Sequence, residues 1–208
     1  DAHYTPRRLL PGGGSVTSQS PWVSRQVSGP PSAPVPVAPS VSVSPPALTP
    51  QRGLTPPDRA DQLPLRQVGH STAAWVVGAH GGAGETTLAT LLRLPGAGRS
   101  WPVAAGNLLP VLLVARTHAS GLLRAQAALR HWAAGAPVNL VGLVLIADAP
   151  GRLPRPLRDL RQHVAAGAPR FWSLPWVESW RQGGDPDPSV ARSTLREISA
   201  LIEGELHA

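Results

Sequence analysis

A glycine-rich segment is the part of this 208-residue chain whose residue types and spacing point most directly to chemistry. It covers residues 79–87 and reads Ala-His-Gly-Gly-Ala-Gly-Glu-Thr-Thr. The apolar run at 73–78 is typical of a buried parallel strand, and residues 86–92 suit a helix. A strand, a glycine-rich loop and a helix in this order predict a phosphate-binding loop, in which backbone N–H groups and the helix N-terminus hold the anion.

One position of this loop carries a negative charge, which would repel a phosphate group. A working loop of this kind has a Lys whose ammonium reaches the β- and γ-phosphates, and Glu85 stands at that position. No Lys elsewhere replaces it, because all 19 basic residues are Arg. Two unit charges about 4 Å apart interact by roughly 4 kcal/mol at an effective dielectric near 20. We therefore expect weak or absent nucleotide binding, with no compensating cation nearby.

Two interpretations of Glu85 follow from its place at the start of the predicted helix. A carboxylate in the first helical turn is stabilised by the helix dipole, typically by about 0.3–1 kcal/mol. The side chain either occupies part of the anion site itself or points into solvent as an ordinary N-terminal helix residue. Both interpretations are compatible with the sequence.

The loop resembles that of the ParA/MinD group of P-loop ATPases, which typically reads Gly-Lys-Gly-Gly-x-Gly-Lys-Thr-Thr. The residues that fit this pattern are Gly81, Gly82, Ala83, Gly84, Thr86 and Thr87. Ala79 replaces the first glycine, His80 replaces the signature Lys of the group, and Glu85 replaces the P-loop Lys. The likeness covers roughly residues 72–203 and implies a small parallel α/β fold with a degenerate nucleotide site.

Four further positions have candidate roles, which come from the same resemblance for Thr86, Asp148 and Trp176 and from the place at a strand end for Arg116. Thr86 takes the metal-ligand position. Asp148 follows a predicted strand where the group usually carries an Asn that contacts adenine, so it either reads a base or caps the following turn. Trp176 lies in a segment that closes over the base in the group, and it lines either a pocket or a partner surface. Arg116, at another strand end, either replaces the missing Lys or is a surface residue or salt-bridge partner of Glu85.

Acidic residues are scarce around the predicted site. No Asp or Glu lies between Glu85 and Asp148, so no Walker B carboxylate follows the strand predicted at 111–115. Phosphoryl transfer needs a bound Mg²⁺, charge stabilisation and an oriented water. We therefore expect no catalytic residue and no cofactor. ATP and magnesium are expected only if Arg116 replaces the Lys and the metal is held by Thr86 and Asp148.

Arginines recur at every third residue in one stretch: Arg152, Arg155, Arg158 and Arg161. On a helix this spacing gives a basic stripe, which is either a contact for nucleic acid or an acidic protein, or a solvated face. The seven His residues show no paired ligand spacing and the chain has no Cys, so neither a metal site nor a disulfide is expected.

The elements that must position these residues follow from the hydrophobic pattern. Strands are predicted at 74–78, 111–115, 140–146 and 171–174. The runs at 111–115 and 140–146 are continuously apolar, which predicts strands that are covered on both faces. Besides the helix after the loop, helices are predicted at 121–134, at 157–166 and from Asp187-Pro188 onward. This alternation indicates an α/β domain with a parallel sheet and helices on both faces. Trp172 is expected in its core.

Residues 1–70 differ in composition from the predicted α/β domain at 71–208. Pro and Ser are concentrated there, and Pro fixes φ and lacks a hydrogen-bond donor. We expect a disordered, partly polyproline arm, which is either a flexible tail or a strap that docks on a partner.

Charge and apolar content limit the classes of partner and location. The formal net charge of +7 favours anionic partners. No apolar run approaches the length that a membrane span needs, and the first residues lack the basic region and apolar core of a signal peptide. We therefore expect a cytoplasmic protein.

These observations predict a non-hydrolysing adaptor or assembly component that has a degenerate nucleotide site and contacts another protein through its arm. One alternative is a nucleotide-binding ATPase in which Arg116 replaces the P-loop Lys. A second alternative is a basic module that binds nucleic acid through Arg152, Arg155, Arg158 and Arg161.

Overall fold

Four parallel strands form the main sheet of the computed structural model, which describes residues 54–69 and 74–207. The strands are β2 (Trp75–Gly78), β4 (Leu109–Arg116), β5 (Val138–Ile146) and β6 (Phe171–Leu174). They lie in the order β2-β4-β5-β6, and all three neighbouring pairs are parallel. All four strands coincide with the predicted strand ranges, so the expectation of a parallel α/β sheet is confirmed.

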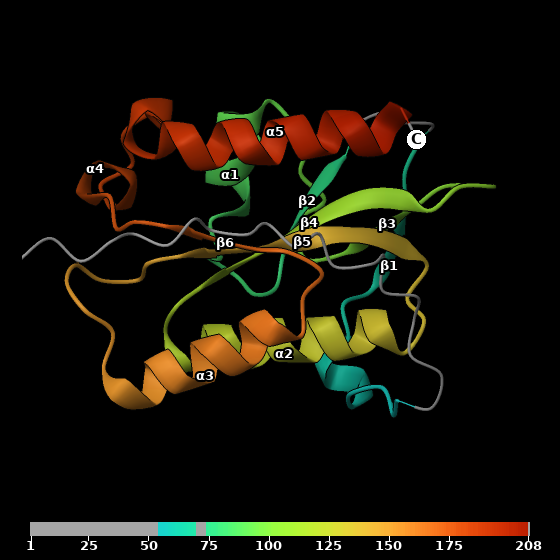
Figure 1. Ribbon diagram of the computed structural model, residues 1–208. Helices are drawn as coiled ribbons and strands as arrows, with labels where there is room; N and C mark the ends of the chain where they lie inside the picture. Colours follow the sequence, from blue (N-terminus) through green and yellow to red (C-terminus); the bar gives the residue numbers. More distant parts are fainter. Residues whose placement is uncertain (1–53, 70–73, 208) are drawn as a thin grey trace, which may run out of the picture. The chain divides into compact units, whose positions relative to one another are not determined.

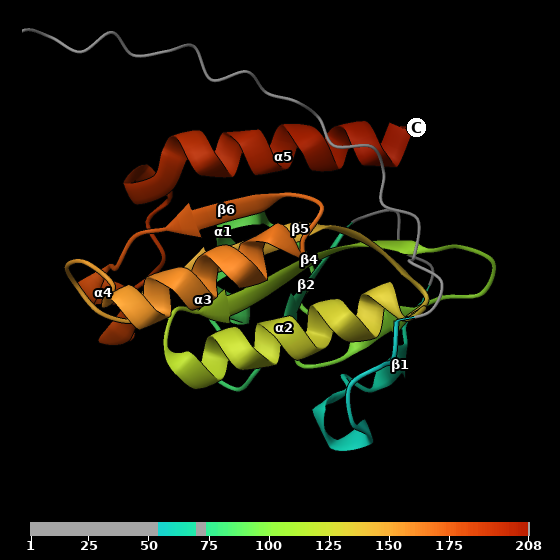
Figure 2. The same ribbon diagram turned by 60° about the horizontal axis from the view of Figure 1, so that its bottom comes forward.

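Four helices cover the two faces of this sheet. The helices α1 (Glu85–Leu92) and α5 (Arg192–His207) lie on one face, and α2 (Ala119–Ala133) and α3 (Arg155–Ala166) lie on the other (Figure 1). The turned view shows α2 and α3 side by side (Figure 2). None of the described helices has the length and apolar character needed to cross a membrane.

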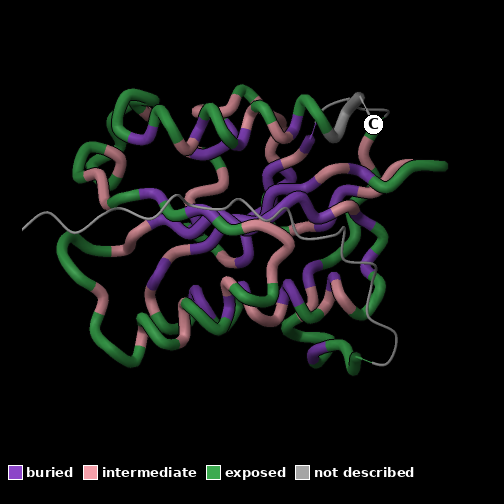
Figure 3. The backbone as a smooth tube through the Cα atoms, in the orientation of Figure 1, coloured by how far each residue is buried: buried purple, intermediate pink, exposed green. Residues whose placement is uncertain are grey.

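Burial on both faces explains why the strand residues are apolar without alternation. In β4 every residue except Pro110 and Arg116 is buried, and in β5 every residue except Asn139. The buried residues follow the strands and the helix surfaces turned toward them (Figure 3). One core cluster lies beneath α2 and the other beneath α1 and α5. A strand covered on two sides has no solvent face, so it reads as a continuous apolar run.

Trp172 packs against Gly142 of β5, next to an irregularity in the pairing of β4 with β5. The register of β4 and β5 shifts between Val111 and Leu112, where Leu140 and Gly142 are the successive partners. A Cβ atom at Gly142 would lie 2.4 Å from the Trp172 ring and 2.8 Å from the Arg170 carbonyl oxygen. Glycine is therefore required for the ring to reach the core, where Trp172 is 5% exposed. The prediction that Trp172 is a core residue is confirmed.

The predicted helices differ from the observed ones mainly at their ends. The helix expected from Asp187 begins with a 3₁₀ turn, η2 (Pro188–Ala191), and becomes α-helical at Arg192. The side chain of Asp187 accepts a hydrogen bond from the Ser189 N–H at 2.8 Å, so it caps the 3₁₀ turn instead of the α-helix. A further short helix, α4 (Glu178–Arg181), was not predicted, because a single turn carries no periodic pattern.

Residues 54–69 pack with the domain, although the sequence analysis assigned them to the arm. The strand β1 (Leu65–Gln67) pairs in parallel with β3 (Trp101–Val103) in a second sheet, and η1 (Arg59–Asp61) precedes it. Leu63 is buried in the core cluster that contains Trp101, and Asp61 forms an ion pair with Arg124 of α2. The Pro-rich composition of this segment did not predict these contacts, because they are all with residues distant in the chain. Residues 1–53, the rest of the expected arm, lie outside the described part.

Candidate functional site

The glycine loop, residues 79–84, connects β2 to α1 at the carboxyl edge of the sheet. Gly82 and Gly84 have φ values of 73° and 92°, which L side chains rarely adopt. A Cβ at Gly84 would also lie 2.6 Å from the Ile146 side chain. The loop therefore needs glycine at position 84 both for its backbone angles and for its close approach to the end of β5.

The loop borders a cavity of about 350 Å³, which we call the loop cavity. Its lining includes all seven loop and helix residues of the predicted nucleotide site, namely Gly81, Gly82, Ala83, Gly84, Glu85, Thr86 and Thr87. It also includes Arg116, as expected for a strand-end residue, together with His80, Gly98 and Arg99. The sequence therefore predicted most of this lining but not Gly98 and Arg99.

The carboxylate of Glu85 is held by neighbouring groups of the protein. One oxygen, Oε1, accepts a hydrogen bond from the Gly98 N–H at 3.3 Å, and the other, Oε2, accepts one from the Thr86 hydroxyl at 3.2 Å. A Cβ at Gly96 would lie only 1.8 Å from Oε1, so the carboxylate rests directly on the Gly96 backbone. Glu85 is therefore not a side chain extended freely into solvent, as one of the two interpretations held.

The segment 95–98 reaches this position by running along the free edge of β2. The Val76 N–H donates to the Pro95 carbonyl at 2.9 Å, and the Ala97 N–H donates to the Val76 carbonyl at 2.8 Å. The Gly78 N–H then donates to the Gly98 carbonyl at 2.7 Å. This pairing aims the Gly98 N–H at Glu85 and brings Arg99 to the loop cavity. The two glycines at 96 and 98 are the sequence signal for such a close approach.

The expectation of no cation near the loop is wrong. Both Arg99 and Arg116 line the loop cavity, one from the segment after α1 and one from the end of β4. The sequence pattern did not reveal this because Arg99 follows no strand and belongs to no helix. Two guanidinium groups therefore share the cavity with the Glu85 carboxylate.

His80 holds the loop to the end of β4 as a neutral imidazole. Its Nε2 accepts a hydrogen bond from the Arg116 N–H at 3.1 Å, and its Nδ1 lies 2.8 Å from the Gly81 carbonyl oxygen. A carbonyl only accepts, so Nδ1 carries the proton and Nε2 is free to accept. Burial lowers the pKa of His80, and the positive charges of His118, Arg116 and Arg99 add to the effect, whereas the hydrogen bond to Gly81 opposes it.

Arg116 is tethered away from Glu85. Its Nη1 donates to the Ala147 carbonyl at 3.1 Å, and its Nε would lie 3.9 Å from a Cβ at Gly84. No ion pair joins Arg116 to Glu85 within the described part of the chain, so the proposed salt-bridge role is wrong. Burial lowers the pKa of Arg116, and the charge of Asp148 opposes this shift. The guanidinium therefore lies between the glycine loop and the next strand end.

A comparison with protein families gives a match over residues 72–197, to a family of unknown function, DUF6668. The chain belongs to the DUF6668 family. The matched range contains the glycine loop and the lining of the loop cavity. No curated protein and no solved structure matches the chain. The resemblance to ParA/MinD ATPases stays a prediction.

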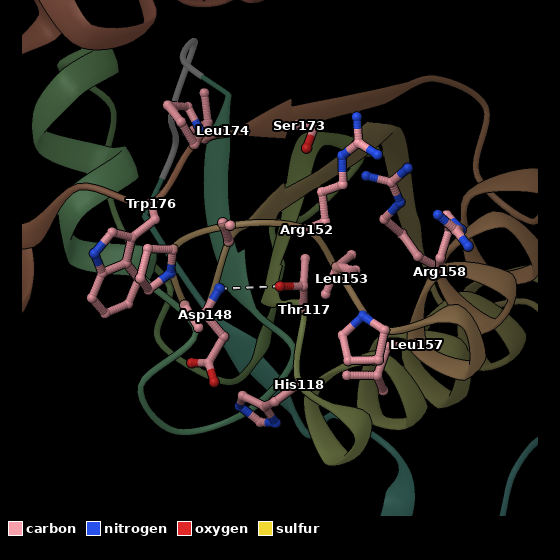
Figure 4. Close-up of a pocket in the computed structure, with 17 residues that line it drawn as sticks. Thr117, His118, Asp148, Arg152, Leu153, Leu157, Arg158, Ser173, Leu174 and Trp176 are labelled. Atoms are coloured by element: carbon pink, nitrogen blue, oxygen red, sulfur yellow. Dashed lines mark hydrogen bonds between the residues drawn. The ribbon is translucent and has the colours of Figure 1, made fainter. Parts of the chain in front are cut away.

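A second cavity of about 800 Å³ opens beside the loop cavity, at the carboxyl ends of β4, β5 and β6 (Figure 4). Asp148 lines this cavity and not the loop cavity, and its N–H donates to the buried Thr117 hydroxyl at 3.0 Å. Thr86 and Asp148, the predicted metal ligands, therefore lie in different cavities. Within the described ranges, no three His, Asp or Glu side chains gather as a metal site.

Trp176 also lines the second cavity, in agreement with one of its two predicted roles. Its Nε1–H donates to the Glu178 carboxylate at 3.0 Å, and the Arg181 guanidinium lies 5.7 Å from the ring centre. These two contacts restrain the ring. Trp180 instead packs against the core beneath α5, so the two tryptophans have different surroundings.

The predicted basic stripe is divided by the fold. Arg152, Arg158 and Arg161 line the second cavity, whereas Arg155 is directed toward Asp159, with an N···O distance of 3.9 Å. The side chains of both Arg155 and Asp159 are mostly exposed. The interpretation as one continuous stripe is therefore replaced by a cluster of three arginines and a separate surface pair.

Proposed function

We propose that this chain is a non-hydrolysing, P-loop-like adaptor whose phosphate site is closed by its own carboxylate. The observation that carries the proposal is the double hydrogen bonding of Glu85 to the Gly98 N–H and the Thr86 hydroxyl. In a P-loop that Thr hydroxyl binds Mg²⁺ and a cation stands at position 85. Here the threonine donates to an acid that stands in the place of the cation.

The surroundings of Thr86 support the absence of phosphoryl transfer. Such chemistry requires a metal ion between the loop and a strand-end carboxylate, together with an oriented water. Asp148, the acid at the end of β5, lines the other cavity. His80, which replaces the signature Lys of the resembled group, uses both ring nitrogens in backbone hydrogen bonds that hold the loop.

The same contacts explain how the loop keeps its shape without phosphate. The helix dipole and the Gly98 N–H favour a negative group at the start of α1, and Glu85 supplies one. The domain then functions through contacts with another protein, with the Pro-rich segment in residues 1–53 as one contact. This role needs a stable fold but no turnover.

Binding of Mg-ATP to matched variants tests the proposal. We expect the natural chain to show no magnesium-dependent binding by titration calorimetry and no hydrolysis above background. Glu85→Lys removes the acid and supplies the cation, so magnesium-dependent binding should appear. Glu85→Gln is the matched control, because it removes the charge without adding one and should give a smaller gain. Magnesium-dependent, micromolar binding by the natural chain would contradict the proposal.

A nucleotide-binding ATPase is the second candidate, because two guanidinium groups, Arg99 and Arg116, line the loop cavity. A guanidinium matches phosphate geometry and carries a permanent charge. This alternative predicts that the natural chain binds Mg-ATP and that Arg116→Ala or Arg99→Ala weakens the binding. In the adaptor proposal both variants leave the magnesium-dependent signal at background.

A further inference from the structure

The second cavity gathers three arginines from two parts of the chain. Arg152 comes from the loop after β5, and Arg158 and Arg161 lie one turn apart on α3. Figure 4 shows the side chains of Arg152 and Arg158 projecting together on one side of the cavity. No carboxylate pairs with any of the three within the described residues. Like charges that line one cavity repel one another, so an anion placed near them would be stabilised.

The opposite side of the cavity has a different chemistry. Trp176, Asp148 and His118 lie there, away from Arg152 and Arg158 (Figure 4). The Trp176 ring is restrained by Glu178 and Arg181, so it offers a fixed aromatic surface. Asp148 would repel an anion and accept a hydrogen bond from an amino group. The cavity therefore has one end suited to an anionic group and another suited to a planar ring that carries donors.

We propose that the second cavity binds a compact phosphorylated ligand with a planar ring, its phosphate held by Arg152, Arg158 and Arg161 and its ring placed at Trp176. A volume of about 800 Å³ lies in the range of small-molecule sites. Guanidinium groups bind phosphate oxygens in bidentate pairs. The inference does not rest on the proposed function, because none of these four residues lines the loop cavity.

The geometry favours a small ligand over a nucleic-acid strand. A protein that follows a nucleic-acid backbone needs basic groups spaced along the path of successive phosphates. The arginines of α3 do not form such a path, because Arg155 is directed toward Asp159 while Arg158 and Arg161 line the cavity. A cavity that is lined by three arginines, none of which pairs with a carboxylate in the described part of the chain, suits one terminal phosphate or diphosphate group.

The test uses the full chain in magnesium-free buffer with EDTA, which excludes the metal-dependent binding considered for the loop. Adenosine monophosphate, pyrophosphate, adenosine and a short single-stranded oligonucleotide are titrated by calorimetry. Arg158→Ala should weaken binding of adenosine monophosphate about tenfold or more, since a charged hydrogen bond is lost. Arg155→Ala is the matched control on the same helix and should change it less than about twofold.

The contact between the ligand ring and Trp176 is tested by a separate variant. Trp176→Ala should weaken the binding of adenosine monophosphate about tenfold, since base stacking on an aromatic side chain is lost. The same variant should leave pyrophosphate binding unchanged. Arg99→Ala changes the lining of the loop cavity only and should alter neither, which keeps this result separate from that of the loop cavity. The inference is overturned if adenosine monophosphate does not bind at millimolar concentration, if Arg155→Ala weakens binding as much as Arg158→Ala, or if the oligonucleotide binds more tightly than the mononucleotide. Retained melting temperatures of the variants exclude unfolding as the cause.

Discussion

Replacing Gly96 with alanine tests directly whether the Glu85 carboxylate rests on the backbone of the 95–98 segment. The added Cβ would lie 1.8 Å from Oε1 and 2.9 Å from Cδ of Glu85, whereas ordinary contact begins at 3.4 Å. The oxygen must therefore withdraw by about 1.6 Å to reach ordinary contact. Its hydrogen bond to the Gly98 N–H, already 3.3 Å long, would then be lost.

The expected energies are small, so the comparison uses a double-mutant cycle. A hydrogen bond to a charged group contributes roughly 1.5–3 kcal/mol, and we take about 1 kcal/mol because Glu85 is only partly buried. Gly96 does not have a positive φ, so alanine at this position also gains about 0.5 kcal/mol by restricting the unfolded chain. Gly96→Ala should therefore cost about 0.5 kcal/mol in the natural chain and gain about 0.5 kcal/mol in a Glu85→Ala background, a coupling of about 1 kcal/mol.

Urea unfolding of the four proteins, followed by tryptophan fluorescence, measures this coupling. With a slope of about 2 kcal/mol per molar, the two effects of Gly96→Ala should differ by about 0.5 M in midpoint. An equal shift in both backgrounds would refute the position of the carboxylate. The proposed closure of the phosphate site would lose its basis with it.

Three further predictions concern the fold and the loop. Gly142→Ala should lower the free energy of unfolding by about 1–3 kcal/mol, because its Cβ would meet the Trp172 ring at 2.4 Å and backbone at 2.8 Å; a melting temperature equal to that of the natural chain would contradict this packing. Gly84→Ala should cost about 1–3 kcal/mol at a φ of 92°, seen as a lower urea midpoint, and a retained midpoint would show that the loop has another shape. Burial lowers the folded-state pKa of both His80 and His131 below the usual 6.5, so the unfolded chain binds protons more readily. Their contribution to stability is thus present above about pH 6.5 and lost as the pH falls toward the lowered values; the urea midpoint should decrease from pH 7.5 to 5.5, and less so in His80→Asn and His131→Asn if this reasoning is right.

The sequence predicted the elements whose burial leaves a local pattern. Continuous apolar runs located β4 and β5, because both faces of these strands are covered. Periodic apolar residues located α2 and α5, because each of these helices buries one face against the sheet. The glycine loop was found because its backbone angles at Gly82 and Gly84 demand glycine, which is visible in the sequence.

The parts that were missed are short segments without a pattern of their own. Three residues of β1 pair with β3, and the segment 95–98 runs along β2. Each is too short for a period to be recognised, and its pairing depends on strands elsewhere in the chain. Arg99 was missed with this segment, which is why the loop cavity contains a cation that the sequence analysis did not expect.

By itself, the sequence determined that an acid stands where a phosphate loop has its cation, that no Lys is present, and that four strands alternate with helices. Only the tertiary structure decided what the acid does, because the Gly98 N–H that binds it comes from the segment beside β2. It also decided which arginines lie together, since Arg152 and Arg158 line one cavity while Arg155 is directed toward Asp159. Burial of a strand or helix face produces a hydrophobic pattern in the sequence. Contacts between residues that are distant in the chain depend instead on how the strands align in the fold.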